Sequence, residues 1–239
     1  MSLGQTILFL VVLFLANTVE AITGFAGTPL AMPPSILLIG VDEAKVILNL
    51  MNLILSPLIV IQGYKYLEGK ALGQIILFMC IGMVAGMAIY NAVSATILIP
   101  LYGLFVIAIG VSGFMKKGQS DSLPKWKQYG TLLGAGVMHG LFISGGPLLV
   151  IYAMMRFRDK DSFRVNLSAI WIILSVALAV KDYAAGLITT DMVWLTAWSV
   201  IPLVGAVIVG NWLHHRISQQ WFLRITYVLL IIVGLSLIV

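Results

Sequence analysis

Long apolar stretches separated by short polar ones run through the whole chain, and most continue for about 18 residues or more. Runs of that length are typical of membrane-spanning helices, so the pattern predicts an all-α polytopic membrane protein. The first half predicts helices at 3–22, 26–39, 44–62, 71–91 and 96–115, and the second half predicts helices at 129–142, 146–155, 163–180, 190–213 and 219–238.

Two consecutive stretches in the second half are too short to cross a membrane singly. The stretches 129–142 and 146–155 hold about 14 and 10 residues, or roughly 21 and 15 Å of helix, against a hydrocarbon core of about 30 Å. Basic loops lie on both sides of this pair, and basic loops favour the cytoplasm. We therefore expect a re-entrant hairpin that enters from the cytoplasm, breaks at 144–147 and returns, with three full spans after it.

One weak pattern occurs twice, and both copies place Gly and Pro inside apolar sequence. Residues 24–30 read Gly-Phe-Ala-Gly-Thr-Pro-Leu, and residues 142–148 read Phe-Ile-Ser-Gly-Gly-Pro-Leu. Further matches keep one register across half of the chain, with a single one-residue slip. A duplicated membrane protein with matching helix breaks commonly has its substrate site at those breaks. The aligned pairs are Gly27–Gly145, Pro29–Pro147, Leu30–Leu148, Asn49–Asn166, Tyr66–Tyr183 and Gly69–Gly186.

The duplication divides the chain into a first membrane repeat at 1–115, a polar cytoplasmic linker at 116–128 and a second membrane repeat at 129–239. By analogy, 3–22 and 26–39 form the first hairpin. Because three spans follow each hairpin, we expect the second repeat to be inverted relative to the first and both termini to be extracytoplasmic. A competing interpretation, in which 3–22 crosses the membrane completely, stays open.

Composition supports the membrane location and argues against other classes. Hydrophobic residues make up 61% of the chain and charged residues 10%, against roughly 45–50% and ~25% in soluble domains. Lys and Arg lie in short loops, so the formal charge of +5 reflects topology rather than binding to nucleic acid. Cys80 is the lone cysteine and forms no disulfide framework. Since neither metal-ligand spacing nor a nucleotide-binding loop is present, we expect no metal and no cofactor.

The two breaks offer backbone groups that suit an anion. A helix that begins after a break exposes free N–H groups and a positive dipole end, and two such starts facing each other bind an anion without a buried Lys or Arg. Glycine lets a ligand approach the backbone closely. The alternative, that Gly and Pro only kink membrane helices, stays open. The substrate-binding candidates at the breaks are Gly24, Ala26, Gly27, Thr28, Ser144, Gly145 and Gly146.

Polar residues on the following helices are further substrate-binding candidates. Asn49 and Asn52 share one helix face. Asn166 recurs at the position of Asn49 in the second repeat, close to Ser168. Such residues also serve simply as hydrogen bonds between membrane helices, at about 0.6 kcal/mol each, and that alternative stays open.

Glu20 and His139 are the ionisable residues closest to the breaks. The offset of 118 carries His139 back to position 21, beside Glu20. An ionisable residue inside a membrane is a functional hypothesis by default, and histidine titrates near neutral pH. We therefore expect this pair to carry a coupling proton. The alternatives are that Glu20 lies nearer the surface, or that His139 makes only local hydrogen bonds.

The motif at 24–30, its second copy around 144–147 and the duplicated frame resemble the TauE/SafE sulfite exporter family, also known as the 4-toluene sulfonate uptake permease family. The resemblance covers essentially the whole chain. It implies a secondary carrier of small sulfur-containing anions such as sulfite, sulfonates, sulfoacetate or thiosulfate, in the inner membrane. It also implies that the site lies around Gly27 and Gly145. Family copies often carry a richer glycine cluster than Ala26-Gly27-Thr28, so the identity of the anion stays open.

We therefore predict a transporter, not an enzyme, that works by alternating access and is coupled to protons. Its expected partners are a small anion and the lipid bilayer. Two rival interpretations are a passive anion channel and an intramembrane enzyme that uses His139 and Glu20 as acid and base. No nucleophile accompanies that pair, which argues against the enzyme. The sequence leaves open the direction of transport and the oligomeric state, a homo-oligomer included.

Overall fold

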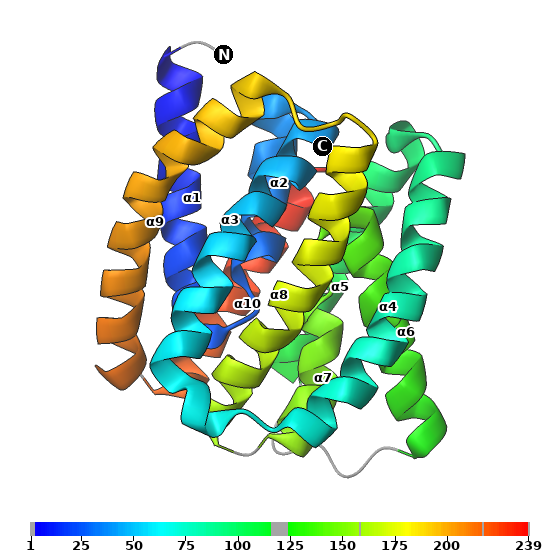
Figure 1. The fold of residues 1–239 in the computed structure, drawn as a ribbon, viewed down its shortest axis with the longest axis vertical. Coiled ribbons are helices and arrows are strands. Elements are labelled where there is room, and N and C mark those ends of the chain that lie inside the picture. Colours follow the sequence, from blue (N-terminus) through cyan, green and yellow to red (C-terminus); the bar gives the residue numbers. More distant parts are fainter. Residues whose placement is uncertain (1–2, 116–123, 158, 217, 239) are drawn as a thin grey trace.

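A computed structural model describes residues 3–115, 124–157, 159–216 and 218–238, and this part of the chain is helical throughout, with no strand (Figure 1). The all-α prediction is therefore confirmed. The helices are α1 (Leu3–Thr23), α2 (Gly27–Ile39), α3 (Val41–Gly63), the short η1 (Tyr64–Tyr66), α4 (Gly69–Ala92), α5 (Ala95–Met115), α6 (Lys125–Phe142), α7 (Gly146–Arg156), α8 (Lys160–Ala184), α9 (Thr190–Arg216) and α10 (Gln219–Leu235).

Every predicted helix is present, and six of those described are long and apolar enough to cross a membrane. These six are α1, α3 with η1, α4, α5, α8 and α9. Helices α2 and α7 are shorter, and each follows one of the predicted breaks. The first arm, α1, has 21 residues, or about 32 Å of helix, so it is as long as a complete span.

The second arm is longer than the sequence pattern predicts. Helix α6 has 18 residues and begins at Lys125 rather than at 129. Pro124 has extended dihedral angles and stands just before the helix, where its ring fits. The polar residues after it continue the helix because they lie at its exposed end, so hydropathy does not mark where it begins. Residues 116–123 of the predicted linker, and the terminal residues Met1 and Val239, lie outside the described residues.

The helices pair across the two halves of the chain. Helix α1 packs along α9, and α6 packs along α4, so each first arm of a hairpin lies against a long helix of the opposite half. Gly82 and Gly86 of α4 lie directly against the α6 backbone at Leu133 and Val137, and Gly210 of α9 lies against α1 in the same way. Small residues let membrane helices approach this closely. The two remaining large interfaces are α3 with α8 and α5 with α10.

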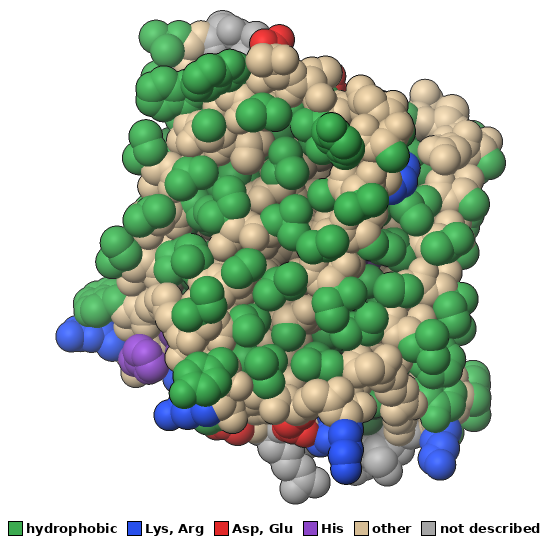
Figure 2. All heavy atoms as spheres, in the orientation of Figure 1, with side chains coloured by type: hydrophobic (Ala, Val, Ile, Leu, Met, Phe, Trp, Pro, Cys, Tyr) green, Lys and Arg blue, Asp and Glu red, His purple; other side chains and the backbone are tan. Residues whose placement is uncertain are grey.

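The outer surface suits a bilayer. Large apolar side chains such as Leu77, Ile81 and Val84 of α4 are more than half exposed, as expected where lipid replaces water. In Figure 2 green apolar side chains cover most of the visible face, and most of its Lys and Arg side chains lie at the lower end. That end carries the loops before α4 and before α8, where Arg156 pairs with Glu68 at 2.8 Å.

Candidate anion site at two helix breaks

The first break separates α1 from α2 at residues 24–26. Gly24 takes a positive φ of 80°, which favours glycine and turns the chain out of the helix. The Thr23 hydroxyl accepts hydrogen bonds from the amides of Phe25 (3.4 Å) and Ala26 (3.3 Å), which satisfies backbone donors inside the turn. The Gly24 carbonyl accepts a hydrogen bond from Trp171 Nε1 on α8 at 2.7 Å. The predicted break is therefore present and is held to α8.

Glu20 lies directly at the N-terminus of α2. Its Oε2 accepts a hydrogen bond from the Thr28 amide at 3.1 Å, and the Thr28 hydroxyl lies 3.5 Å away. The side chain is buried within the protein. A free helix amide and the positive dipole end offset part of the cost of burying this carboxyl group. A Cβ at Gly27 would lie 2.3 Å from the same oxygen, so glycine makes room for Glu20 there.

The second break separates α6 from α7 at residues 143–145. Ile143 adopts left-handed dihedral angles with φ 55°. The Ser144 hydroxyl donates to the Phe142 carbonyl at 2.9 Å, so the Tyr102 hydroxyl, 2.6 Å away, donates to Ser144. The Tyr102 ring also stacks on Phe142 at 4.3 Å. Tyr102 of α5 therefore holds this break from the side, a role that was not predicted from the sequence.

The two breaks touch each other. A Cβ on Gly146, the first residue of α7, would lie only 2.5 Å from the Phe25 carbonyl oxygen. Trp171 links the breaks a second time, because its indole N–H binds Gly24 and its ring stacks on His139 at 5.3 Å. Segments about 120 residues apart in sequence thus meet at one buried place.

His139 is buried against the second break without a hydrogen-bond partner. Its exposure is 1%, and neither ring nitrogen bonds to any described residue. The interpretation of local hydrogen bonds is therefore not supported. Leaving a buried polar atom unsatisfied costs about 1–3 kcal/mol, so a histidine in this state is suited to bind something other than the protein.

The remaining predicted residues form two separate groups. Asn49 and Asn52 lie at the α3–α8 interface, where their amide groups donate to the backbone and side chain of Ser175. The Asn49 Oδ1 atom is buried and has no described partner. Asn166 lies farther along α8 and binds the loop before α4, accepting from the Glu68 amide and donating to the Tyr66 carbonyl.

Ser168 makes a local bond on its own helix. Its hydroxyl donates to the Arg164 carbonyl at 3.0 Å. The structure therefore places Glu20 and Thr28 at the first break and His139 and Ser144 at the second, and the two breaks meet at Phe25 and Gly146. It holds Asn166 and Ser168 in contacts within the protein.

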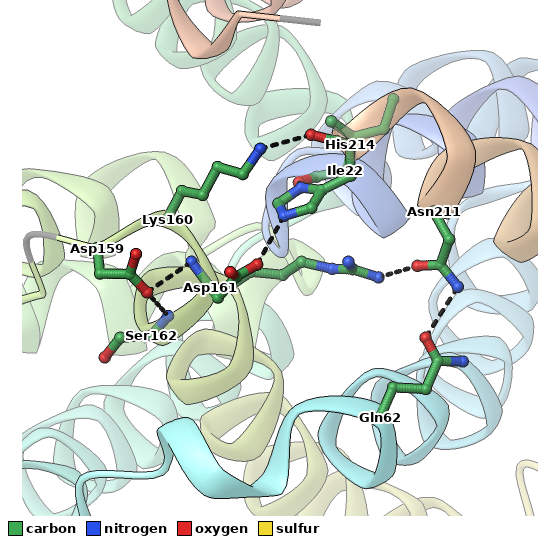
Figure 3. A network of polar contacts seen from close by, with 9 residues as sticks. Ile22, Gln62, Asp159, Lys160, Asp161, Ser162, Asn211 and His214 are labelled. Carbon is green, nitrogen blue, oxygen red and sulfur yellow. Dashed lines mark hydrogen bonds and ion pairs between the residues drawn. The ribbon is translucent and has the colours of Figure 1, made fainter. Parts of the chain in front are cut away.

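A polar cluster beside the first break joins α8 and α9 (Figure 3). His214 Nδ1 lies 2.8 Å from the Ile22 carbonyl, and its Nε2 lies 3.0 Å from Asp161. Lys160 donates to the His214 carbonyl at 2.6 Å. We call the contact of Asp161, His214 and Ile22 the α8–α9 closure.

A basic side chain of α8 makes a further polar contact with α9. Arg164 donates to Asn211, which in turn donates to Gln62 of α3 at 2.8 Å (Figure 3). Arg164 is buried, and its Nε has no described partner.

A comparable contact lies beside the second break. Tyr90, near the end of α4, donates to Asp42 in the first turn of α3 at 2.6 Å, and its ring packs edge-on against Phe142. Lys45 Nζ lies 3.2 Å from the centre of the Tyr90 ring. We call the contact of Asp42, Tyr90 and Phe142 the α3–α4 closure. Each closure thus joins an acid in a first helical turn, a ring near a helix end and one of the last two residues of the helix before a break.

Comparison with known proteins decides the family. The profile of the sulfite exporter TauE/SafE family matches residues 8–237. The chain belongs to the TauE/SafE family. A curated relative from Comamonas testosteroni, "Probable inner membrane transporter protein TsaS", is 26% identical over 181 residues, which cover 73% of this chain and 74% of the relative. No solved structure matches the chain. The resemblance seen in the sequence is confirmed, and the family and the six long apolar helices make this a multi-pass membrane protein.

Proposed function

We propose that this TauE/SafE protein is a secondary carrier that moves a small sulfur-containing oxyanion across the inner membrane. The family is one of sulfite exporters, and the relative is named as an inner membrane transporter. The observation that carries the proposal is the meeting of two helix breaks at a buried place, where His139 and the start of α7 have no described hydrogen-bond partner. Such a place binds an anion and shields it from lipid.

Two inverted repeats underlie this site. In the alignment of the repeats, α1 corresponds to α6 and α4 corresponds to α9. Replacing each helix of the packed pair α1–α9 by its counterpart therefore gives α6–α4, which is also a packed pair. The pairs α3–α8 and α5–α10 each join a helix to its own counterpart. A pseudo-two-fold axis between the halves accounts for both facts. In this arrangement 1–115 and 129–239 are the repeats, and the basic loops and the linker face the cytoplasm, with both termini outside.

The carrier works by alternating access between the two closures. Opening the α3–α4 closure exposes the second break from one side of the membrane, and opening the α8–α9 closure exposes the first break from the other. Each closure consists of a few polar contacts at a helix end, which is the kind of contact that forms and breaks without unfolding a helix. With both closed the site is shut off from either side.

Glu20 and His139 are the groups that carry a coupling proton. Both are buried beside a break and lie on either side of the contact between Phe25 and Gly146. A proton taken up at this depth changes the charge that the anion meets, which is the basis of coupled transport.

Thermal-shift measurements test the proposed substrate class. The purified protein is screened against sulfite, sulfoacetate, taurine, thiosulfate and dicarboxylates. A ligand at about 100 times its dissociation constant stabilises the folded state by roughly 2.7 kcal/mol. Stabilisation by a sulfur oxyanion supports the proposal, whereas stabilisation by dicarboxylates alone contradicts it.

A further inference from the structure

The two breaks have the same architecture, and the contacts of their glycines show which residues correspond. A Cβ on Gly27 would meet the Ala16 carbonyl and Glu20, and a Cβ on Gly145 would meet the Ala135 carbonyl and His139. In space, therefore, His139 stands at the second break where Glu20 stands at the first. Both pairs, Ala16–Ala135 and Glu20–His139, are 119 residues apart in the sequence, against 118 for Gly27 and Gly145, so an alignment at the offset of 118 misses this correspondence by one residue.

The first break is already occupied by an anionic group of the protein. The Glu20 carboxyl oxygen accepts the Thr28 amide at the start of α2. A second oxyanion there would compete with the Glu20 carboxyl group for the same amide and would meet a group of like charge whenever Glu20 is ionised. The Glu20 carboxyl group at the first break thus shows how an oxyanion accepts an amide at the start of one of these helices. It leaves no room there for a second oxyanion.

At the second break, the backbone N–H groups at the start of α7 have no described hydrogen-bond acceptor. Helix α7 has no side-chain cap, and Pro147 has no N–H, so Gly146 and Leu148 carry the free amides of its first turn. No described residue accepts a hydrogen bond from either amide. His139, whose side chain starts beside Gly145, is buried and lacks a partner on both nitrogens. An imidazole supplies an N–H here, whereas a carboxylate would supply only acceptors.

We propose that one oxyanion binds at the second break, between the first turn of α7 and His139, in the position that the Glu20 carboxylate takes at the first break. This inference rests on the proposed function and makes it more specific. The ligand group is a compact –SO₃⁻ or sulfite oxyanion, since Phe25 closes one side of Gly146. His139 is a substrate ligand, and the carrier holds a single anion rather than one at each break.

Replacing His139 by an acid tests this location. His139→Glu gives the α7 start its own carboxylate, as Glu20 does for α2, and His139→Gln is the neutral control that keeps an N–H donor. Titration calorimetry of the full chain in detergent with sodium sulfite and with toluenesulfonate measures affinity, and gel filtration checks folding. We expect His139→Glu to weaken binding by on the order of 100-fold or more. His139→Gln should weaken it by about tenfold or less.

The outcomes separate the location from the function. The assignment to the second break is overturned if His139→Glu still binds the anion. It is also overturned if Glu20→Gln loses binding while His139→Glu retains it. Either result leaves the carrier proposal standing. Wild-type protein that binds neither probe overturns the proposed function and this inference together. If His139→Glu fails to fold, Gly146→Val is measured instead, because its branched side chain blocks the α7 start without adding charge. Unchanged affinity in that variant also overturns the location.

Discussion

Replacing Gly146 by alanine tests whether contact between the two breaks matters for binding. The added Cβ would lie 2.5 Å from the Phe25 carbonyl oxygen, whereas ordinary contact begins at about 3.4 Å, so one backbone must move by about 0.9 Å, the difference of the two. Neither partner can rotate away, because both are backbone segments within tight turns. Overpacking of this kind costs roughly 1–3 kcal/mol.

The same displacement moves the α7 start relative to the first break, so affinity falls along with stability. We expect Gly146→Ala to unfold earlier in a thermal melt by several degrees and to bind the anion about 10- to 100-fold more weakly. Gly134→Ala on α6 is the matched control. Its Cβ would only touch Leu148 at 3.4 Å, so it should behave as wild type. Gly146→Ala with the stability and affinity of Gly134→Ala would refute the idea that close contact of the breaks builds the site.

Three further predictions follow from individual contacts. The first uses a reporter cysteine, Thr23→Cys, in a Cys80→Ser background. His214→Ala should increase labelling of this cysteine from the side of the basic loops, because it removes the contact that holds Ile22. Tyr90→Phe should not increase it, because Tyr90 contacts Asp42 instead. Equal labelling in both variants would contradict separate closures. Glu20→Gln should flatten the pH dependence of uphill uptake by proteoliposomes, and a wild-type pH profile would exclude it as the proton carrier. Asn166→Ala should lower the free energy of unfolding by about 1–3 kcal/mol and leave anion affinity unchanged, because Asn166 holds the loop before α4. A loss of affinity would show instead that Asn166 belongs to the binding site.

The helices and the breaks were predictable because both depend on local sequence. Apolar runs of membrane length fix where a helix lies, and the predicted 3–22 differs from the observed α1 by one residue. The break at 24–26 followed from Gly and Pro in apolar sequence, which a lipid-embedded helix tolerates only at special places. The start of α6 was misplaced, because polar residues at an exposed helix end carry no hydropathy signal.

The side chains that complete the site were less accessible to sequence reasoning. Trp171 reaches Gly24 across 147 residues, and Tyr102 reaches Ser144 across 42, and a single sequence contains no signal for such pairs. The repeat alignment also gave Asn49 and Asn166 the same expected role, yet they face different partners. Asn49 meets Ser175 on α8, whereas its counterpart meets the loop before α4. Positions that an alignment pairs therefore need not share their neighbours.

Trans-stimulated exchange of radiolabelled sulfite in proteoliposomes tests the proposed function most directly. Vesicles that contain the protein are loaded with unlabelled sulfite, and uptake of labelled sulfite is followed against empty and protein-free vesicles. A carrier that alternates between its two closures predicts saturable uptake that rises when sulfite is present inside, and loss of that uptake in Gly27→Val and Gly145→Val. Uptake that grows linearly with concentration and ignores internal sulfite would indicate a channel, and the absence of exchange with sulfite or any sulfonate would contradict the proposed function itself.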